Sequence, residues 1–414
     1  MMYKLKIVVL LALGFLLAWH PFPLRGQMAL GQYEEEAPVC TWNIFGPSGA
    51  AGLSLGDTMF TLAADASALF TNPALMTRLP SLAVSLGGSL QSADFFRYGP
   101  VNTGPLSTVG NAGLSTAAAD LAAISVRVLG WSVGLGLALS EIYDRPEAVA
   151  RSASPYYLLS FSQSGYLRTL NLSLGREIID GLSLGLGLNL VSGRWEWNLT
   201  DAWSGVTIID SRTRSLSGYF FNGGLCWQAS AGLSLAAVFR APYQRKAASR
   251  SSLHYSAQSA DILIQGSGED TFYQPLVLGL GLACKFFDQF QFTGEMTYWN
   301  WSSYRASLLG EDVARDFRDT WKAGLGLECL SWLRLFKQYF DLPSRIGLVY
   351  DPQPMSSPRS SYINFSLGVG LYWKGIHLDL GTILGAENGS GRHLTAQRLA
   401  LTLTVFSGPR PAKG

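Results

Sequence analysis

The chain has 414 residues, of which 48% are hydrophobic and only 14% are charged, and its formal net charge at pH 7 is +2. Soluble proteins carry about 25% charged residues, so a medium other than water must meet much of this surface. The apolar content excludes intrinsic disorder. The only long apolar run, Ile7 to Trp19, has 13 residues, whereas a membrane-spanning helix needs about 20. If the chain lies in a membrane, it crosses as strands.

The N-terminus has the features of a secretory signal peptide. Two lysines precede the apolar run, and Ala29 and Gly31 follow it in a small-x-small cleavage pattern. We therefore expect residues 1–31 to be removed; cleavage after Gly26 and an uncleaved membrane anchor are the alternatives. Without the three basic residues of this segment, 28 basic and 29 acidic residues remain, a net charge of −1. This balance offers no basic surface for nucleic acid.

The cysteines predict neither a metal site nor a disulfide scaffold. The chain has four cysteines, which lie far apart and form no CxxC pair: Cys40, Cys226, Cys284 and Cys329. Zinc sites and disulfide-dense domains need closer spacing than this. We expect no metal and no cofactor.

From about residue 81 onward, the hydrophobic pattern has the period of two that is typical of β-strands. Leucines alternate with small or polar residues over 182–191, and similar alternation recurs over 276–283, 363–371 and 399–405. Trp and Tyr gather at several strand ends. These features indicate a transmembrane β-barrel with an apolar outer face. Fourteen strands are expected, at 81–91, 119–129, 131–143, 165–178, 182–197, 213–229, 231–243, 271–286, 289–302, 317–330, 343–351, 361–374, 376–385 and 393–406.

The connections between these strands alternate in length. Five are long, 92–118, 144–164, 198–212, 244–270 and 303–316, and tight turns lie between the first of them. Long outer loops and short inner turns are typical of an all-β, antiparallel barrel of the outer membrane. One connection on the short-turn side, 331–342, holds twelve residues with apolar groups near helical spacing. It is expected to be either an interfacial amphipathic helix or a packed turn.

The segment before the barrel has a different pattern. Small residues over 46–56 precede a stretch, 57–70, that is compatible with a short helix. Asn72-Pro73 ends that helix, because proline lacks an N–H and disfavours the helical conformation of the preceding residue. The expected parts of the chain are a signal peptide at 1–31, an N-terminal hatch or plug at 32–80, the barrel at 81–406 and a C-terminal tail at 407–414.

The stretch from Ala64 to Ala74, which leads directly into the first strand, resembles the FadL family of outer-membrane long-chain fatty-acid and hydrocarbon transporters. The resemblance implies a fourteen-stranded barrel plugged by a hatch with an Asn-Pro-Ala motif. It also implies lateral release of substrate beside a kinked third strand, and we expect transport by passive diffusion. The family usually has a glycine after the motif, where this chain has Leu75-Met76. The hatch motif residues are Asp65, Asn72, Pro73 and Ala74.

Two sets of barrel residues are candidates for a role in transport. Gly134 and Gly136 provide glycines that a kink in the third strand would need, which makes them candidates for a lateral gate. Strand parity points nine ionisable side chains into the lumen: Arg127, Glu177, Arg240, Lys285, Glu295, Lys322, Glu328, His377 and Asp379. The candidates for ligand-carboxylate binding or lumen charge are Arg127, Arg240, Lys322, Glu295 and Glu328. Alternatively, these charges form salt-bridged networks that brace the lumen and hatch.

No catalytic set emerges from the sequence. Two G-x-S-x-G sequences, at 52–56 and 181–185, lack the strand–turn–helix context of a serine hydrolase. His377 and Asp379 share a strand face, but no serine is identifiably placed against them. We therefore expect no enzyme activity.

The expected function is transport of hydrophobic small molecules, with long-chain fatty acids as the first candidate, in the cell outer membrane and in contact with its lipid. The outer capture surface would include aromatic residues in or beside two long connections: Phe95, Phe96, Tyr98, Tyr255 and Phe272. The alternative is a barrel that serves as a platform for protein partners in secretion or surface attachment.

Overall fold

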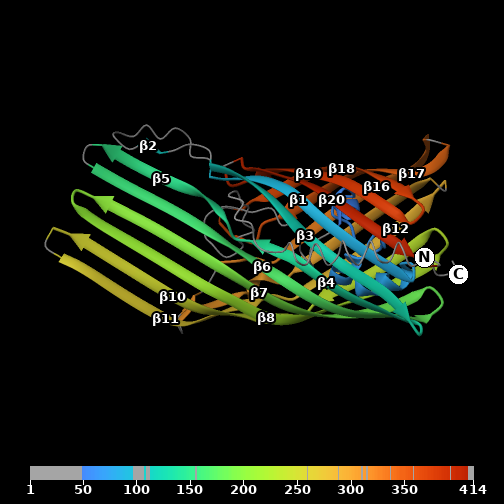
Figure 1. The fold of residues 1–414 in the computed structure, drawn as a ribbon, viewed down its shortest axis with the longest axis horizontal. Coiled ribbons are helices and arrows are strands. Elements are labelled where there is room, and N and C mark those ends of the chain that lie inside the picture. Colours follow the sequence, from blue (N-terminus) through green and yellow to red (C-terminus); the bar gives the residue numbers. More distant parts are fainter. Residues whose placement is uncertain are drawn as a thin grey trace.

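The computed structural model describes residues 49–96, 107–108, 112–153, 156–258, 260–287, 289–308, 311–313, 316–335, 337–357, 359–391 and 393–408. The expected signal peptide, Cys40 and Tyr98 lie outside these residues, as do the side chains of Phe95 and Phe96. The described strands form one antiparallel sheet that closes on itself as a barrel (Figure 1). No helix in the described part of the chain is both long and apolar enough to span a bilayer.

The strands of the sheet are β1 (Leu82–Phe96), β2 (Ser107–Thr108), β3 (Ala112–Val128), β4 (Trp131–Ile142), β5 (Arg145–Ala153), β6 (Tyr156–Ile179), β7 (Leu182–Trp203), β8 (Val206–Ser230), β9 (Leu233–Arg240), β10 (Tyr243–Ala257), β11 (Ala260–Gln274), β12 (Val277–Phe286), β13 (Phe290–Trp299), β14 (Arg305–Leu308), β15 (Glu311–Val313), β16 (Thr320–Leu335), β17 (Gln338–Pro352), β18 (Ser361–Trp373), β19 (Ile376–Asn388) and β20 (Thr395–Ser407). The helices are α2 (Ala50–Leu53), α3 (Ala68–Thr71) and two 3₁₀ turns, η1 (Pro73–Arg78) and η2 (Trp301–Ser303).

Four traverses of the barrel wall are each divided into two strands, one of them into β13 and β14, which pair with β12 and β11. β4 and β5 both pair with β6, and β9 and β10 both pair with β8. β11 and β12 pair with β10 and β9 in turn. Proline cannot donate a ladder hydrogen bond, and Pro242 and Pro275 lie at two of the four breaks. Counted this way, the described residues form fourteen traverses, and β1 closes the barrel by pairing with β20. The predicted fold class is confirmed.

The period of two sorts the side chains between lipid and lumen. In β12, Leu278, Leu280 and Leu282 are exposed on the outer surface, whereas Gly279 and Gly281 face inward. The same division recurs around the wall and leaves a belt of exposed leucines and aromatics outside. Such a belt is the lipid-facing surface of an outer-membrane barrel.

The outer connections differ from the expectation. The spans 144–164, 198–212 and 244–270, which were expected as long loops, are mostly paired strands. Their hairpins, β5–β6, β7–β8 and β10–β11, project well beyond the rest of the barrel (Figure 1). The reason is that alternation continues past the lipid belt with Ser and Thr on the outer face, so the backbone satisfies its hydrogen bonds by extending the ladder.

The connection at 331–342 is neither a helix nor a packed turn, and both expectations were wrong. β16 and β17 continue through it as a hairpin, with Trp332 opposite Asp341 and Leu335 opposite Gln338. Its apolar residues lie on both faces of the hairpin, so they do not alternate strictly with polar residues along the sequence. This irregular spacing is why the segment was compatible with the pattern of a helix.

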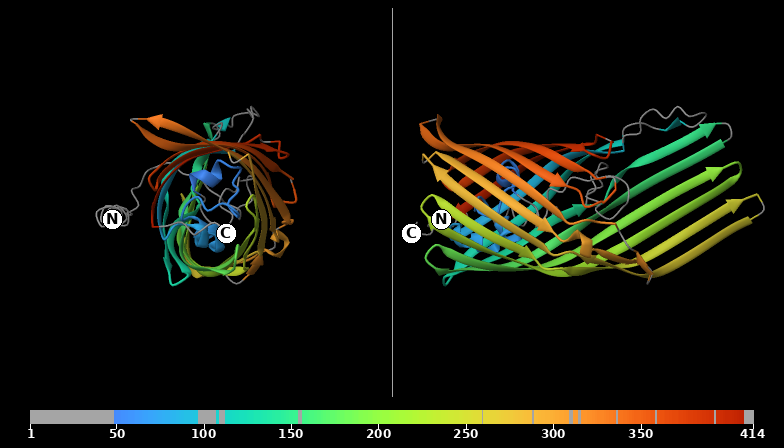
Figure 2. Two further views of the ribbon diagram at one scale, coloured as in Figure 1. Left: turned by 90° about the vertical axis from the view of Figure 1, so that its right-hand side faces the viewer. Right: turned by 180° about the vertical axis from the view of Figure 1, so that it is seen from behind.

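The short helices α2, α3 and η1 lie inside the barrel, where Figure 2 shows them in blue within the ring of strands. Nearly all of their side chains are buried. Hatch residues and inner-wall residues share two buried hydrophobic clusters, one of which joins Phe60 to Trp195 and Trp299. This internal segment, residues 49–80, is called the hatch below.

Candidate functional site

Asn72 joins two parts of the hatch to the barrel wall. Its side chain is fully buried, and its Oδ1 accepts a hydrogen bond from the Ala74 N–H at 3.1 Å, which caps η1. Its Nδ2 donates to the carbonyl oxygens of Phe60 at 2.7 Å and Leu225 at 3.3 Å. Gly224 makes room, because a Cβ there would lie 2.0 Å from Asn72 Oδ1.

Pro73 and Ala74 rest directly on the wall at Gly185 of β7. A Cβ at Gly185 would lie 2.3 Å from both the Pro73 carbonyl carbon and the Ala74 nitrogen. Pro73 occupies the first position of η1, where its missing N–H costs nothing. The hatch and wall backbones can therefore approach this closely only because the wall residue has no side chain.

Asp65 is held by the hatch backbone. Its Oδ1 accepts from the Ser67 N–H at 2.7 Å, and its Oδ2 has no hydrogen-bond partner among the described residues. Burial raises the pKa of the Asp65 carboxyl above its usual value. Gly49 leaves room for the Asp65 carboxylate, because a Cβ at Gly49 would lie 1.9 Å from Asp65 Oδ2.

Three of the five expected lumen charges bind the hatch. Lys322 Nζ lies 2.7 Å from Asp57 Oδ2, and both side chains are 8% exposed. Glu295 accepts a hydrogen bond from the Phe60 N–H. Arg127 donates to the carbonyl oxygens of Thr77 at 2.5 Å and Leu79 at 2.7 Å, at the end of η1. These contacts favour the bracing alternative for Lys322, Glu295 and Arg127.

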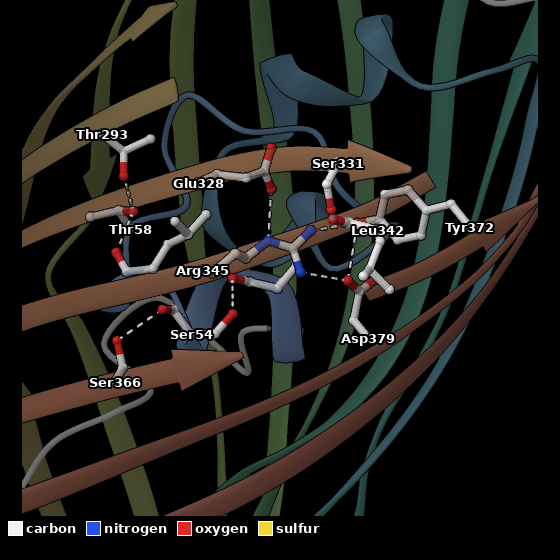
Figure 3. A network of polar contacts seen from close by, with 12 residues as sticks. Ser54, Thr58, Thr293, Glu328, Ser331, Leu342, Arg345, Ser366, Tyr372 and Asp379 are labelled. Atoms are coloured by element: carbon white, nitrogen blue, oxygen red, sulfur yellow. Dashed lines mark hydrogen bonds and ion pairs between the residues drawn. The ribbon is translucent and has the colours of Figure 1, made fainter. Parts of the chain in front are cut away.

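Glu328 belongs to a buried network centred on Arg345 (Figure 3). Arg345 Nε donates to Glu328 at 2.7 Å, and its two terminal nitrogens donate to Asp379 at 2.6 Å and to the Tyr372 hydroxyl at 2.5 Å. Tyr372 in turn donates to Asp379 at 3.0 Å, and His377 stacks on the Tyr372 ring. The sequence places Asp379 on one strand face with His377. In the structure the charged partner of Asp379 is Arg345, which was not among the predicted site residues.

Three asparagines on neighbouring strands form a ladder that ends on the hatch. Asn171 Nδ2 donates to Asn189 at 2.8 Å, and Asn189 Nδ2 donates to Asn222 at 2.7 Å. Asn222 Nδ2 then donates to the carbonyl oxygen of Phe70 at 2.9 Å, at the end of α3. The ladder was not predicted, although an inward Asn within an apolar strand was an available signal.

Arg240 differs from the other expected charges because it lies among aromatic rings. Its guanidinium carbon is 4.7 Å from the centre of the Trp299 ring, 5.8 Å from Tyr243 and 5.9 Å from Phe220. Its side chain also donates to the Pro275 carbonyl oxygen at 3.5 Å. Guanidinium groups bind favourably to aromatic faces.

Two further arginines lie next to this group. Arg214 is 2.6 Å from Asp270 and stacks over Trp195 at 4.3 Å. Arg245 is 2.8 Å from Glu141 and donates to the Tyr143 hydroxyl at 2.7 Å. We call the whole set the aromatic chamber: Trp195, Arg214, Phe220, Arg240, Tyr243, Arg245, Phe272 and Trp299. Through Trp195, Phe220, Phe272 and Trp299, it is continuous with Phe60 of the hatch.

Gly134 and Gly136 of β4 also face the hatch. A Cβ at Gly134 would lie 2.6 Å from Met76 Sδ, and one at Gly136 would lie 2.8 Å from Leu69 and Phe70. The irregularity of this third traverse lies further along, as a register shift between Leu139 and Glu141 and a break before β5. The structure thus gives the two glycines a packing role, and their role in a gate stays a prediction.

No cluster of three or more His, Cys, Asp or Glu side chains able to hold a metal lies among the described residues. The cysteines described, Cys226, Cys284 and Cys329, are free thiols.

Comparison with known proteins gives consistent results. A family model for outer membrane protein transport proteins (OMPP1/FadL/TodX) matches residues 48–373. A Pseudomonas aeruginosa FadL homologue has a TM-score of 0.62 at 14% identity, over 90% of this chain and 99% of that one. The Pseudomonas putida toluene transporter TodX has a TM-score of 0.61 at 12% identity, over 88% of this chain and 100% of that one. A search of curated proteins finds no match.

Proposed function

The chain belongs to the OMPP1/FadL/TodX family of outer-membrane transport proteins, and on that premise we propose that it carries long-chain fatty acids by passive diffusion through the hatch-plugged barrel. It is an outer-membrane channel for hydrophobic small molecules and not an enzyme. The observation that carries the choice of a fatty acid is Arg240 in its aromatic surroundings.

A fatty acid presents two chemistries, a carboxylate and an apolar tail. Arg240 is 8% exposed, and its guanidinium, a group that is always charged in proteins, lies among aromatic faces. Such a group can orient a carboxylate, while the rings around it bury the tail. Each buried CH₂ contributes about 0.8 kcal/mol, so the apolar wall dominates affinity and the arginine mainly orients the ligand.

The projecting hairpins provide an apolar approach to the chamber. The face of β8, β10 and β11 that carries the buried Leu216 continues outward with apolar residues at paired positions. Ile208 lies opposite Tyr255, Tyr255 opposite Ile262, and Leu253 opposite Ile264. We propose that this face collects hydrophobic ligand outside the cell. Tyr255 and Phe272, expected in the capture surface, both lie on it.

Release would occur beside the third traverse, as the lateral-release proposal requires. β4 departs from regular pairing between Leu139 and Glu141, and a second register shift follows in β5, between Arg145 and Ala148. The Glu141 side chain reaches across to Arg245 of the aromatic chamber, 2.8 Å away. This ion pair links the irregular wall segment to the position proposed for the ligand.

One observation favours the alternative of a platform for protein partners. Beyond Thr271, the outer edge of β11 pairs with no strand among the described residues, and Ile262, Leu263 and Ile264 are exposed there. An exposed apolar strand edge is a template for β-strand addition by another protein. Capture of an extended peptide at this edge, with no response to fatty acids, would favour that function.

Replacing Arg240 tests the ligand class. We expect Arg240→Gln to weaken binding of a labelled long-chain fatty acid to the purified barrel by roughly 10- to 100-fold, since a hydrogen bond to a charged group contributes about 1.5–3 kcal/mol. Binding of the fatty alcohol of equal length should be unchanged. Isothermal titration in detergent measures both.

The matched control is Arg176→Gln, because Arg176 also lies over an aromatic ring, Trp131, but on the outer surface. That change should leave both ligands unaffected. Equal loss of acid and alcohol binding in Arg240→Gln, or saturable binding of toluene in place of either, would count against the fatty-acid proposal.

A further inference from the structure

The lipid-facing wall of the barrel is hollowed across β16 to β20. The hollow has a volume of about 550 Å³ and is lined almost entirely by apolar surface. Leu327, Ile346, Leu367 and Leu380 are among the residues around it. At one end Cys329 and Ser344 lie opposite each other in register, with smaller side chains than the leucines beside them. We call this feature the outer groove. Pockets for small hydrophobic ligands have similar volumes, about 300–1,000 Å³.

A cation and two aromatic rings lie at the short-turn end of the same wall segment. Trp373 of β18 is four residues beyond Val369 of the groove, or about 13 Å along the strand. The Phe340 ring stacks on Trp373 with centroids 6.0 Å apart, and Lys374 Nζ lies 4.9 Å from the centre of the Trp373 ring. Aromatic residues with a nearby Lys mark the headgroup level of a membrane.

The β16–β17 hairpin extends this edge. Its tip stands away from the ring of strands in Figure 2, at the short-turn end of the barrel. Pro343 lies where the hairpin leaves the wall, and the pairing of β17 with β18 lacks residues 342 and 343 there. Leu333 and Phe340 lie opposite each other and continue the lipid-facing side, while Arg334 and Lys337 are exposed at the tip.

We propose that the outer groove binds one phospholipid of the periplasmic leaflet, with an acyl chain in the groove and its phosphate at Lys374. Three features select this occupant. The groove is continuous with the lipid-facing belt, so hydrocarbon is what meets it. The short turns of an outer-membrane barrel lie on the periplasmic side, so the adjoining leaflet is phospholipid. The cations at that edge complement a phosphate.

The site is distinct from the lumen, so its test does not depend on transport. The full chain is reconstituted in vesicles of phosphatidylethanolamine and phosphatidylglycerol that contain a trace of phosphatidylcholine with a diazirine in one acyl chain. After photolysis, peptide mass spectrometry locates the lipid adducts. We expect them to be enriched on β17 and β18 over Leu170 and Leu172 of β6, seven traverses away on the same exposed belt.

Two variants separate the groove from ordinary lipid contact. Ser344→Trp, which fills the groove, should abolish the enrichment, and Lys374→Glu should lower it about fivefold, the effect expected of one cation at a phospholipid surface. The matched control is Arg176→Glu, because Arg176 also lies over an exposed Trp, Trp131, at a short turn of the wall, but away from the residues that line the outer groove; it should change nothing. Equal labelling of β6 and β17–β18, or enrichment unaffected by Lys374→Glu, would overturn the proposal.

Discussion

We expect Gly185→Val to displace the hatch from its position against the barrel wall. The new Cβ would lie 2.3 Å from two backbone atoms of the hatch, the Pro73 carbonyl carbon and the Ala74 nitrogen, which cannot rotate away as a side chain does. Overpacking costs about 1–3 kcal/mol. The ratio of molecules with the hatch packed on the wall to molecules with the hatch displaced should therefore fall by roughly 5- to 150-fold. The hydrogen bond between Thr77 and Ser183, 2.7 Å long, is strained by the same displacement.

Displacement of the hatch opens the lumen, so the single-channel conductance in planar bilayers should rise. Proteolysis within residues 49–80 should also become faster. Gly294→Val is the matched control, because its Cβ would meet only side-chain atoms at ordinary contact distances, the nearest being Leu325 Cδ2 at 3.5 Å. If both variants conduct and resist protease as the wild type does, the hatch does not depend on the close contact at Gly185.

The second large effect is expected in Arg345→Ala. Arg345 and Asp379 are 3% and 0% exposed, and the arginine joins Glu328, Asp379 and Tyr372. Removing it leaves carboxylates buried without their cation, and breaking a buried ion pair in this way costs about 3–5 kcal/mol. The free energy of unfolding in urea, followed by tryptophan fluorescence in lipid vesicles, should fall by that amount.

Arg212→Ala provides the comparison for Arg345. Arg212 pairs with Asp210 at 2.7 Å, but its side chain is 51% exposed, and exposed pairs contribute about 0–1 kcal/mol. A loss in Arg345→Ala no larger than that in Arg212→Ala would show that the network in Figure 3 does not stabilise the barrel.

The barrel could be predicted because its main signal is local. Alternation over 182–191 places Leu184, Leu186 and Leu190 on the outer surface and Ser183 and Asn189 inside, as strand geometry requires. The limits of the strands were less predictable. A period of two tells which face a residue takes, but it does not tell where the membrane ends, so the projecting hairpins were taken for loops.

The contacts of the hatch could be predicted only in part. Strand parity identified Lys322 and Glu295 as inward residues, but their partners are Asp57, 265 residues away, and the Phe60 backbone. Which inward residues meet depends on strand tilt and hatch placement, and neither leaves a local trace in the sequence. For the same reason Arg345 and the asparagine ladder were missed, although each lies on an alternating strand.

Uptake of a labelled long-chain fatty acid by bacterial cells that lack their own transporter tests the central claim most directly. The cells express this chain or Arg240→Gln, after heat-modified gel mobility has shown that both are folded in the outer membrane. We expect uptake with the wild-type chain and a marked reduction with Arg240→Gln. Absence of uptake by correctly inserted wild-type protein would contradict the proposed transport of fatty acids.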